Sequence, residues 1–352
     1  MPITKDKITA SLALIDCVSI SASDAVFETL ANRLNVTNDK QKTHYQDSWS
    51  RTATKFERAR DICDDLKSLL DEVNGIPSSN GIIASDIGSN EITIDIANYT
   101  QTEGHMVVVR DRRYEMVPNE TTDARLIDAV LNAVTDETQA VIELGCGWGR
   151  NLASTALRTD RRDLTFIGLE QSADGLQCTE ELLAKDPTIQ ARTNDFDFYS
   201  PDFSALQEYN NIVVFSCAAI EQISFIGTDF IDQVMAIADN VTLIFYEPIG
   251  WQRLKQLQEF GVMTSVMEIM GNVPADKQHM KVYNFELKDS AVSANAVSWS
   301  ICGRYNLNLW SVIQHAISCG TVNAKHSEFD IYGMNPFNPY SLIILEKRNP
   351  VS

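Results

Sequence analysis

Short apolar runs recur through the middle and the end of this chain, and helical patterns separate most of them. Continuous apolar strands that alternate with helices are typical of a mostly parallel sheet that is covered on both faces. The pattern predicts five such strands, then a helix over residues 307–318, then two more strands. The predicted strands lie at residues 140–143, 164–170, 189–193, 211–216, 241–246, 322–331 and 341–345.

The first part of the chain has a different pattern, in which apolar residues recur mostly at steps of three and four. From Tyr45 to Val73 this spacing predicts one long amphipathic helix over residues 44–73, closed by Asn74-Gly75. Shorter helices are predicted at residues 8–17 and 25–34. We therefore expect residues 1–88 to form a helical region that packs on the rest of the chain or on a second subunit.

A linker over residues 89–120 follows, in which residues 92–96 and 106–110 are predicted to pair as a β-hairpin. A helix over residues 121–134 then leads into the first strand of the sheet. Between the fifth strand and the last helix, residues 249–304 form an insertion with a predicted strand at 281–285. Because ligands bind at the carboxyl edge of such sheets, we expect this insertion to act as a substrate lid.

The first strand of the sheet runs into the glycine-rich stretch Glu143-Leu144-Gly145-Cys146-Gly147-Trp148-Gly149. A strand, a tight glycine turn and a helix start hold nucleotide-type ligands at the edge of a parallel sheet. Gly145 is expected to adopt angles closed to other residues, and Gly147 and Gly149 to leave room for a ligand. The dinucleotide fingerprint G-x-G-x-x-G requires glycine where Arg150 stands, which disfavours a nicotinamide-dependent oxidoreductase.

This stretch resembles motif I of the class I S-adenosylmethionine (SAM) methyltransferases, E/D-x-G-x-G-x-G. The resemblance continues with Glu170 at the end of the second strand and Asp195-Phe196 after the third. It covers residues 121–248 and 305–348. It implies a doubly wound, mostly parallel seven-stranded α/β sheet, a SAM-binding domain over residues 121–350, and SAM as the cofactor.

The resemblance also implies which residues hold the cofactor. The carboxylate of Glu170 would accept both ribose hydroxyls, Asp195 would accept the adenine amine, and Phe196 would pack on the adenine ring. The residues implied for cofactor binding are Glu143, Gly145, Cys146, Gly147, Gly149, Glu170, Gln171, Asp195, Phe196 and Ser216.

Methyl transfer from a sulfonium requires a nucleophile in line with the methyl carbon, and a base only where the nucleophile must first lose a proton. Candidate catalytic residues follow the fourth and fifth strands: Glu221, Tyr246 and Glu247. Either carboxylate can also hold a cationic amine, and each can instead be a capping or hydrogen-bonding residue. His279 and His315 are alternative bases, although a lone histidine is more often structural.

Composition and charge limit the ligands and partners that this chain is expected to bind. The formal net charge is −19 over 352 residues, and the few arginine clusters form no basic stripe, which disfavours nucleic acid. No apolar segment is long enough to span a membrane. Seven scattered cysteines without a C-x-x-C pair indicate reduced thiols and a cytoplasmic location. Five scattered histidines show no metal-ligand spacing, so no metal site is predicted.

The sequence therefore predicts a SAM-dependent methyltransferase that acts on oxygen or nitrogen of a small-molecule or peptide acceptor. A homodimer, or another homo-oligomer, is expected through the N-terminal helices. Two alternatives stay open. One is a catalytically silent SAM-binding protein. The other is a different SAM-family transferase such as an aminopropyltransferase, in which an aspartate usually stands at the position of Ser216.

Overall fold

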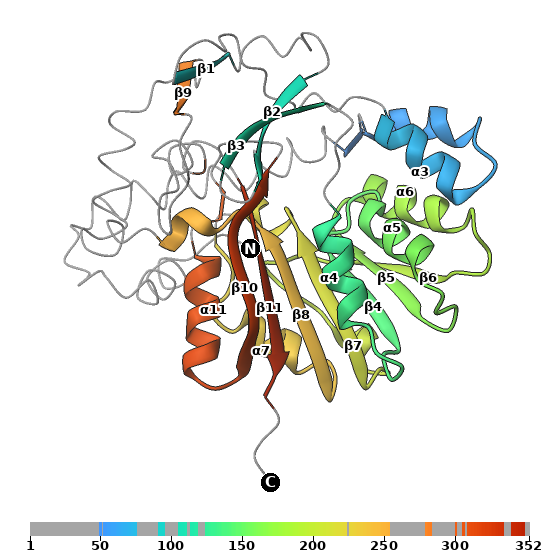
Figure 1. Ribbon diagram of the computed structural model, residues 1–352. Helices are drawn as coiled ribbons and strands as arrows, with labels where there is room; N and C mark the ends of the chain where they lie inside the picture. The colour runs from blue at the N-terminus through green and yellow to red at the C-terminus, as the bar shows by residue number, and fades with distance from the viewer. Residues whose placement is uncertain are drawn as a thin grey trace.

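A computed structural model describes most of the predicted sheet and the helix before it (Figure 1). The described residues are 49–75 without 51, 91–95, 105–110, 113–118, 124–253 without 224, 279–283, 300, 305–333 without 307, and 339–348. The predicted helices at 8–17 and 25–34, and residues 254–278 of the insertion, lie outside these ranges. Within them, no helix is long and apolar enough to cross a membrane.

Seven strands form the body of the sheet, in the order β10-β11-β8-β7-β4-β5-β6. Their bounds are β4 (Ala140–Leu144), β5 (Thr165–Glu170), β6 (Gln190–Asp195), β7 (Asn211–Cys217), β8 (Asn240–Glu247), β10 (Val322–Gly333) and β11 (Tyr340–Lys347). The five neighbouring strands β8, β7, β4, β5 and β6 are parallel to one another. Strand β11 is antiparallel to both β8 and β10. The predicted mostly parallel seven-stranded sheet is confirmed.

Helices cover both faces of this sheet, because neighbouring residues of each strand are apolar on both sides. Val141 packs toward α4 and α5, whereas Ile142 packs toward α7 and α11. The helices are α4 (Arg125–Ala133), α5 (Arg150–Arg158), α6 (Ala173–Leu183), α7 (Phe230–Met235) and α11 (Leu309–Ser318), with short 3-10 turns η1 (Ser204–Leu206), η2 (Ile220–Gln222) and η3 (Gly250–Arg253). The doubly wound arrangement is therefore also confirmed.

A hairpin extends the sheet beyond β10, and a separate two-stranded sheet joins distant segments. Strands β2 (His105–Arg110) and β3 (Arg113–Pro118) form the hairpin, and Arg110 of β2 pairs with Tyr332 of β10. Strand β1 (Glu91–Asp95) pairs instead with β9 (His279–Tyr283) in the insertion. The predicted pairing of residues 92–96 with 106–110 is therefore wrong, because local spacing cannot reveal a partner this distant in the chain.

The predicted long helix is interrupted. Residues 52–60 are helical, a turn follows, and α3 (Leu66–Gly75) begins after Asp65, whose carboxylate accepts the main-chain N–H of Ser68 at 2.8 Å. Such an N-cap starts a new helix. The interruption turns Ile62 outward, and this residue is 72% exposed although its spacing placed it on the apolar face.

The remaining apolar residues of this region pack against α5 and α6, beside β5 and β6 (Figure 1). Phe56 is fully buried, and its ring meets the indole of Trp148 edge-on with centroids 6.3 Å apart. Two polar contacts add to the packing. Arg60 Nη1 donates to Glu181 Oε2 at 2.6 Å, and Lys185 Nζ donates to the carbonyl oxygen of Cys63 at 2.6 Å. The described part of the N-terminal region therefore packs on α5 and α6.

Phe56→Ala is expected to lower the free energy of unfolding by about 3–5 kcal/mol, because it removes a large buried ring from this contact. Urea denaturation followed by circular dichroism measures the change. Ile62→Ala is the matched control, since Ile62 is exposed and its truncation should leave the midpoint unchanged. A larger loss for Ile62→Ala than for Phe56→Ala would contradict the interrupted helix.

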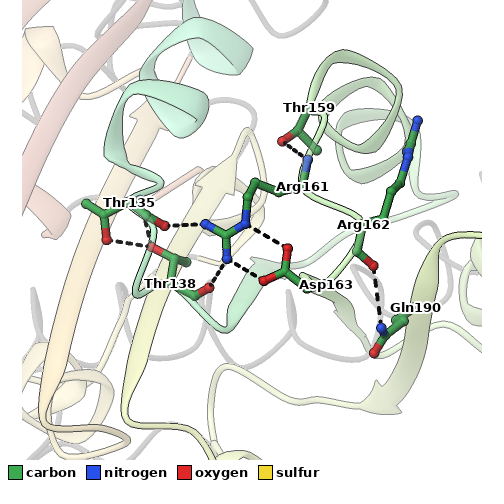
Figure 2. Close-up of polar contacts among 7 residues, drawn as sticks. All are labelled: Thr135, Thr138, Thr159, Arg161, Arg162, Asp163 and Gln190. Atoms are coloured by element: carbon green, nitrogen blue, oxygen red, sulfur yellow. Dashed lines mark hydrogen bonds and ion pairs between the residues drawn. The ribbon is translucent and has the colours of Figure 1, made fainter.

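At the amino-terminal edge of the sheet, Arg161 ties two loops together (Figure 2). Its guanidinium donates to the carbonyl oxygens of Thr135 at 2.6 Å and Thr138 at 3.1 Å, and it binds both carboxylate oxygens of Asp163 at 2.7 Å. These contacts join the segment before β4 to the segment before β5. Arg161 is thus a structural residue of the edge opposite the glycine loop.

Candidate active site at the carboxyl edge

The glycine loop between β4 and α5 has the backbone that its sequence predicts. Gly145, Gly147 and Gly149 have φ angles of 71°, 58° and 80°, a region that residues with a side chain rarely adopt. The N–H groups of Gly145 and Cys146 donate to the carbonyl oxygen of Leu169 at 2.7 and 3.0 Å. The loop is therefore anchored to the end of β5.

The space beside these glycines is filled by the protein itself. A Cβ atom on Gly147 would lie 2.3 Å from the indole of Trp49, and one on Gly149 would lie 2.9 Å from Thr179. Gly145 is similarly closed by Ala219, at 2.5 Å. The direction that a Cβ atom would take at each of the three glycines is thus occupied by a side chain. Trp49, from the N-terminal region, lies against the glycine loop.

Glu170, at the end of β5, binds the glycine loop through its carboxylate. Its Oε1 accepts the N–H groups of Gln171 and Ser172 at 2.9 Å each, and its Oε2 accepts the N–H of Gly147 at 2.9 Å. Burial raises the pKa of Glu170, while the three N–H groups act in the opposite direction. These bonds leave one acceptor position on Oε2, and the side chain of Gln171 is exposed.

Glu143, at the end of β4, has a buried carboxylate that is only partly satisfied. Its Oε1 accepts from Asn151 Nδ2 at 2.7 Å, whereas its Oε2 has no hydrogen-bond partner among the described residues. Burial raises the pKa of Glu143 to about 8, and the nearby charge of Arg150 opposes that shift. Arg150 is exposed at the first turn of α5. The loop therefore carries one acidic and one basic group side by side.

At the end of β6, Asp195 is exposed but Phe196 is only 3% exposed and packs in the core, 4.9 Å from the ring of Phe198. Phe198 is half-buried, and its ring lies against Gly145. The stretch Asn194-Asp195-Phe196-Asp197-Phe198 holds two acid–phenylalanine pairs, and sequence reasoning selected only the first. The ring beside the glycine loop belongs to Phe198, which the sequence analysis missed.

Glu247, at the end of β8, is fully buried and holds the turn after β7. Its Oε1 accepts from Ser216 Oγ at 2.8 Å and from the N–H groups of Ala219 and Ile220 at 3.1 Å each. Its Oε2 accepts the N–H of Glu221 at 3.2 Å. Burial raises the pKa of Glu247 to about 7. The carboxylate and the buried hydroxyl of Ser216 are thus engaged with each other and with the main chain.

The structure brings Glu221 and Tyr246 to the same edge as Glu247. Glu221, in η2, is half-exposed, and Tyr246 is buried with its ring 5.0 Å from that of Tyr340. His315 lies in the last turn of α11, which leads into the start of β10 at the opposite edge. The side chain of His279 lies outside the described residues. Tyr340 was not considered from the sequence, because it follows the glycine loop by almost 200 positions.

Comparison with known proteins gives no match to a family model and none to a curated protein. Among solved structures, a SAM-dependent methyltransferase from Aquifex aeolicus is 10% identical and covers 65% of this chain and 94% of its own, with a TM-score of 0.35. The mycolic acid cyclopropane synthase CmaA1, complexed with SAH and CTAB, is 10% identical and covers 66% and 86%, with a TM-score of 0.40.

EvdMO1 is 12% identical with a TM-score of 0.35, and the alignment covers 66% of this chain and 42% of that protein. Matches with identities and TM-scores this low establish no activity, and the fold is decided by the strand order of the chain's own sheet. The chain has the class I methyltransferase fold. In this fold the sheet edge that carries the glycine loop, Glu170 and Glu221 is a single continuous surface, because all three follow carboxyl ends of neighbouring parallel strands.

Proposed function

We propose that this protein is a SAM-dependent methyltransferase that acts on oxygen or nitrogen of a small-molecule or peptide acceptor. The observation that carries the proposal is the buried Oε2 of Glu143, without a hydrogen-bond partner in the described part of the chain, beside Arg150 at the glycine loop. SAM ends in an amino acid that bears one ammonium and one carboxylate. A pair of opposite charges on one loop fits that end.

The residues of the loop fit the rest of SAM as well. The free oxygen of Glu143 would accept from the ammonium, and Arg150 with the first turn of α5 would hold the carboxylate. The remaining acceptor position of Glu170 would receive a ribose hydroxyl. Asp195 would accept from the adenine amine, with the ring of Phe198 in the place that Phe196 was expected to fill.

The other residues of the predicted set would act through the main chain or through a neighbour. Gly145, Cys146, Gly147 and Gly149 shape the loop, and the N–H of Gln171 helps to hold Glu170. Ser216 orients Glu247, which supports the turn that carries Glu221. We therefore infer a positioning role for Glu247, and we keep Glu221 as the candidate base or amine-binding group.

When bound, SAM supplies a methyl group on a sulfonium sulfur, and that sulfur takes the C–S electron pair when a nucleophile's lone pair attacks the methyl carbon. The protein's share is to orient the acceptor, exclude water and remove a proton where the acceptor carries one. We further propose a division into residues 1–88, 89–120 and 121–350 with an insertion at 249–304, a cytoplasmic location, and self-association through the N-terminal helices.

Calorimetric titration of the purified protein with SAM tests the proposal. We expect saturable binding that weakens sharply in Glu170→Ala, and no binding of NADH. Glu346→Ala is a matched control, because Glu346 lies in β11 and pairs on the surface with Lys325 at 3.2 Å. Absence of SAM binding by the wild-type protein would refute the proposal. Binding without SAH release from any acceptor would favour the catalytically silent alternative.

Binding of SAM is expected to release a proton from Glu143. Because its pKa is about 8 in the absence of SAM, Glu143 is mostly protonated at pH 7 and must ionise to accept the ammonium. The affinity for SAM should therefore rise between pH 6 and 8, by up to about tenfold per unit, and then level off. Calorimetry at pH 7 in buffers of different ionisation enthalpy measures the number of protons released for each SAM bound.

The raised pKa of Glu143 also determines how the stability of the fold depends on pH. Since the folded-state pKa of Glu143 lies above the ordinary value of 4.5, its contribution to the free energy of unfolding is greatest below pH 4.5 and is lost as the pH rises toward 8. Glu143→Gln should abolish the proton release and weaken SAM binding. A wild-type proton count of zero at pH 7 would contradict the assigned role of Glu143.

A further inference from the structure

A row of four side chains crosses neighbouring strands on the face of the sheet covered by α4 and α5. The row consists of Cys217, Tyr246, Tyr340 and Tyr332. Cys217 of β7 is in register with Tyr246 of β8, and Tyr246 is in register with Leu342 of β11. Tyr340 precedes Leu342 by two residues and so points to the same face. The pairing of Tyr340 with Tyr332 of β10 extends the row by one more strand.

The row borders the glycine loop. The charge of Arg150, at the start of α5, acts on the side chains of both Cys217 and Tyr340. Tyr246 and Tyr332 are buried, whereas Tyr340 and Cys217 are half-exposed and Arg150 is exposed. The half-exposed members of the row therefore lie on β7 and β11, on either side of β8, at the carboxyl edge of the sheet that carries the glycine loop.

The electrostatic surroundings of this place favour a cation. Burial raises the pKa of the Tyr340 phenol well above its usual value, and the charges of Glu221 and Glu247 add to that shift, so the ring stays neutral. Glu247 already accepts four hydrogen bonds from the protein. Glu221 accepts from Gln222 Nε2 at 2.9 Å and is half-exposed at the same edge, so its carboxylate also reaches the surface.

Aromatic faces beside a carboxylate bind ammonium groups, because the ring quadrupole and the carboxylate both attract positive charge. An acceptor that carries a carboxylate or a phosphate would be repelled by the charge of Glu221, whereas an ammonium would be attracted to it. We propose that the methyl acceptor is a small molecule that carries an amine, bound with its nonpolar body against Tyr340 and its nitrogen at Glu221. This inference rests on the proposed methyltransferase function.

The proton balance assigns a task to Glu221. The bound ammonium gives one proton to the carboxylate of Glu221, which leaves a neutral amine. The nitrogen lone pair then forms the bond to the methyl carbon as the C–S bond breaks and its electron pair stays on sulfur. The products are a methylated ammonium and the thioether SAH, and Glu221 returns its proton to solvent.

Matched pools of acceptors test the inference after SAM binding has been established by calorimetry. The pools hold primary amines, alcohols and carboxylic acids that share the same phenylalkyl and alkyl bodies, and SAH release is followed for each. We expect release with the amine pool at least about tenfold above the other two. Equal release with alcohols or acids, or none with amines while SAM still binds, would overturn the inference and leave the cofactor assignment standing.

Three variants test where the amine binds. Glu221→Gln removes the charge and should weaken binding of the best amine to the SAH-loaded protein by roughly 10- to 100-fold, since hydrogen bonds to charged groups are the strong ones. Tyr340→Ala should weaken it as well, and Tyr340→Phe less so, because the ring is retained. Affinity for SAM should stay within about threefold in all three.

Glu208→Gln and Tyr209→Phe are the matched controls, since both residues lie beside Arg192, away from the glycine loop. Retained SAM binding shows that each variant is folded. If the Tyr340 variants lose SAM binding, the test of the amine site rests on amine binding by the Glu221→Gln variant. Amine binding that is unchanged in Glu221→Gln would refute the site.

Discussion

Gly147→Asp is expected to abolish SAM binding, with a loss of at least about 100-fold. The substitution adds a side chain where φ is 58° and where a Cβ atom would lie 2.3 Å from the Trp49 ring. It also adds a negative charge beside the buried carboxylates of Glu143 and Glu170, and it moves the N–H that Glu170 accepts. Calorimetric titration with SAM measures the loss.

Gly320→Ala separates the local effect from general backbone strain. Gly320 has a similar φ of 76°, but it lies beyond α11 at the opposite edge, where a Cβ would meet only the end of Arg348. We expect a small loss of stability and unchanged SAM binding. The pair Gly147→Ala and Gly147→Ala/Trp49→Ala forms a further test. If the clash with Trp49 matters, the double variant should be closer to the wild type than additivity predicts.

Glu247→Ala is expected to destabilise the fold by about 4 kcal/mol or more. The substitution leaves the buried hydroxyl of Ser216 and three main-chain N–H groups without their acceptor, and each unsatisfied group costs about 1–3 kcal/mol. Thermal and urea denaturation measure the loss. Glu247→Gln retains one acceptor oxygen, so it should cost less.

A catalytic role for Glu247 makes the opposite prediction. If Glu247 were the general base, Glu247→Gln would lose turnover while its stability stayed close to that of the wild type. If it positions the turn after β7, activity and stability should fall together, and Glu247→Ala should be the more severe variant by both measures. The pKa of about 7 does not decide between these roles, because burial alone accounts for its direction.

The sheet could be predicted because each of its strands carries its own local signal. The apolar runs of β4, β5, β7 and β8 are short and bounded by polar residues, and the glycine turn follows β4 directly. Features that depend on distant segments could not be predicted this way. β1 finds its partner in the insertion, and the long helix ends because Asp65 caps a new one.

In the candidate site, too, residues linked by a local spacing could be predicted, whereas residues distant in sequence could not. Glu143, Gly147 and Glu170 were found because a spacing rule connects them, and the structure joins Gly147 to Glu170 by a hydrogen bond. Trp49 and Tyr340 were missed because they are distant in sequence from the glycine motif: Trp49 meets Gly147, and Tyr340 meets Tyr246, only in the folded protein. The hydrogen-bonded role of Glu247 depends on the turn after β7, whose shape the sequence does not reveal.

The position of β11 has a consequence for synthesis on the ribosome. β11 is the last of the nine strands to be made, yet it lies inside the sheet between β8 and β10. Until residues 340–347 emerge, β8 and β10 each present an open edge, which is the kind of surface that pairs with other chains. Nascent chains that stop before Tyr340 should therefore aggregate or recruit chaperones, although every helix in the described part of the chain has already been made.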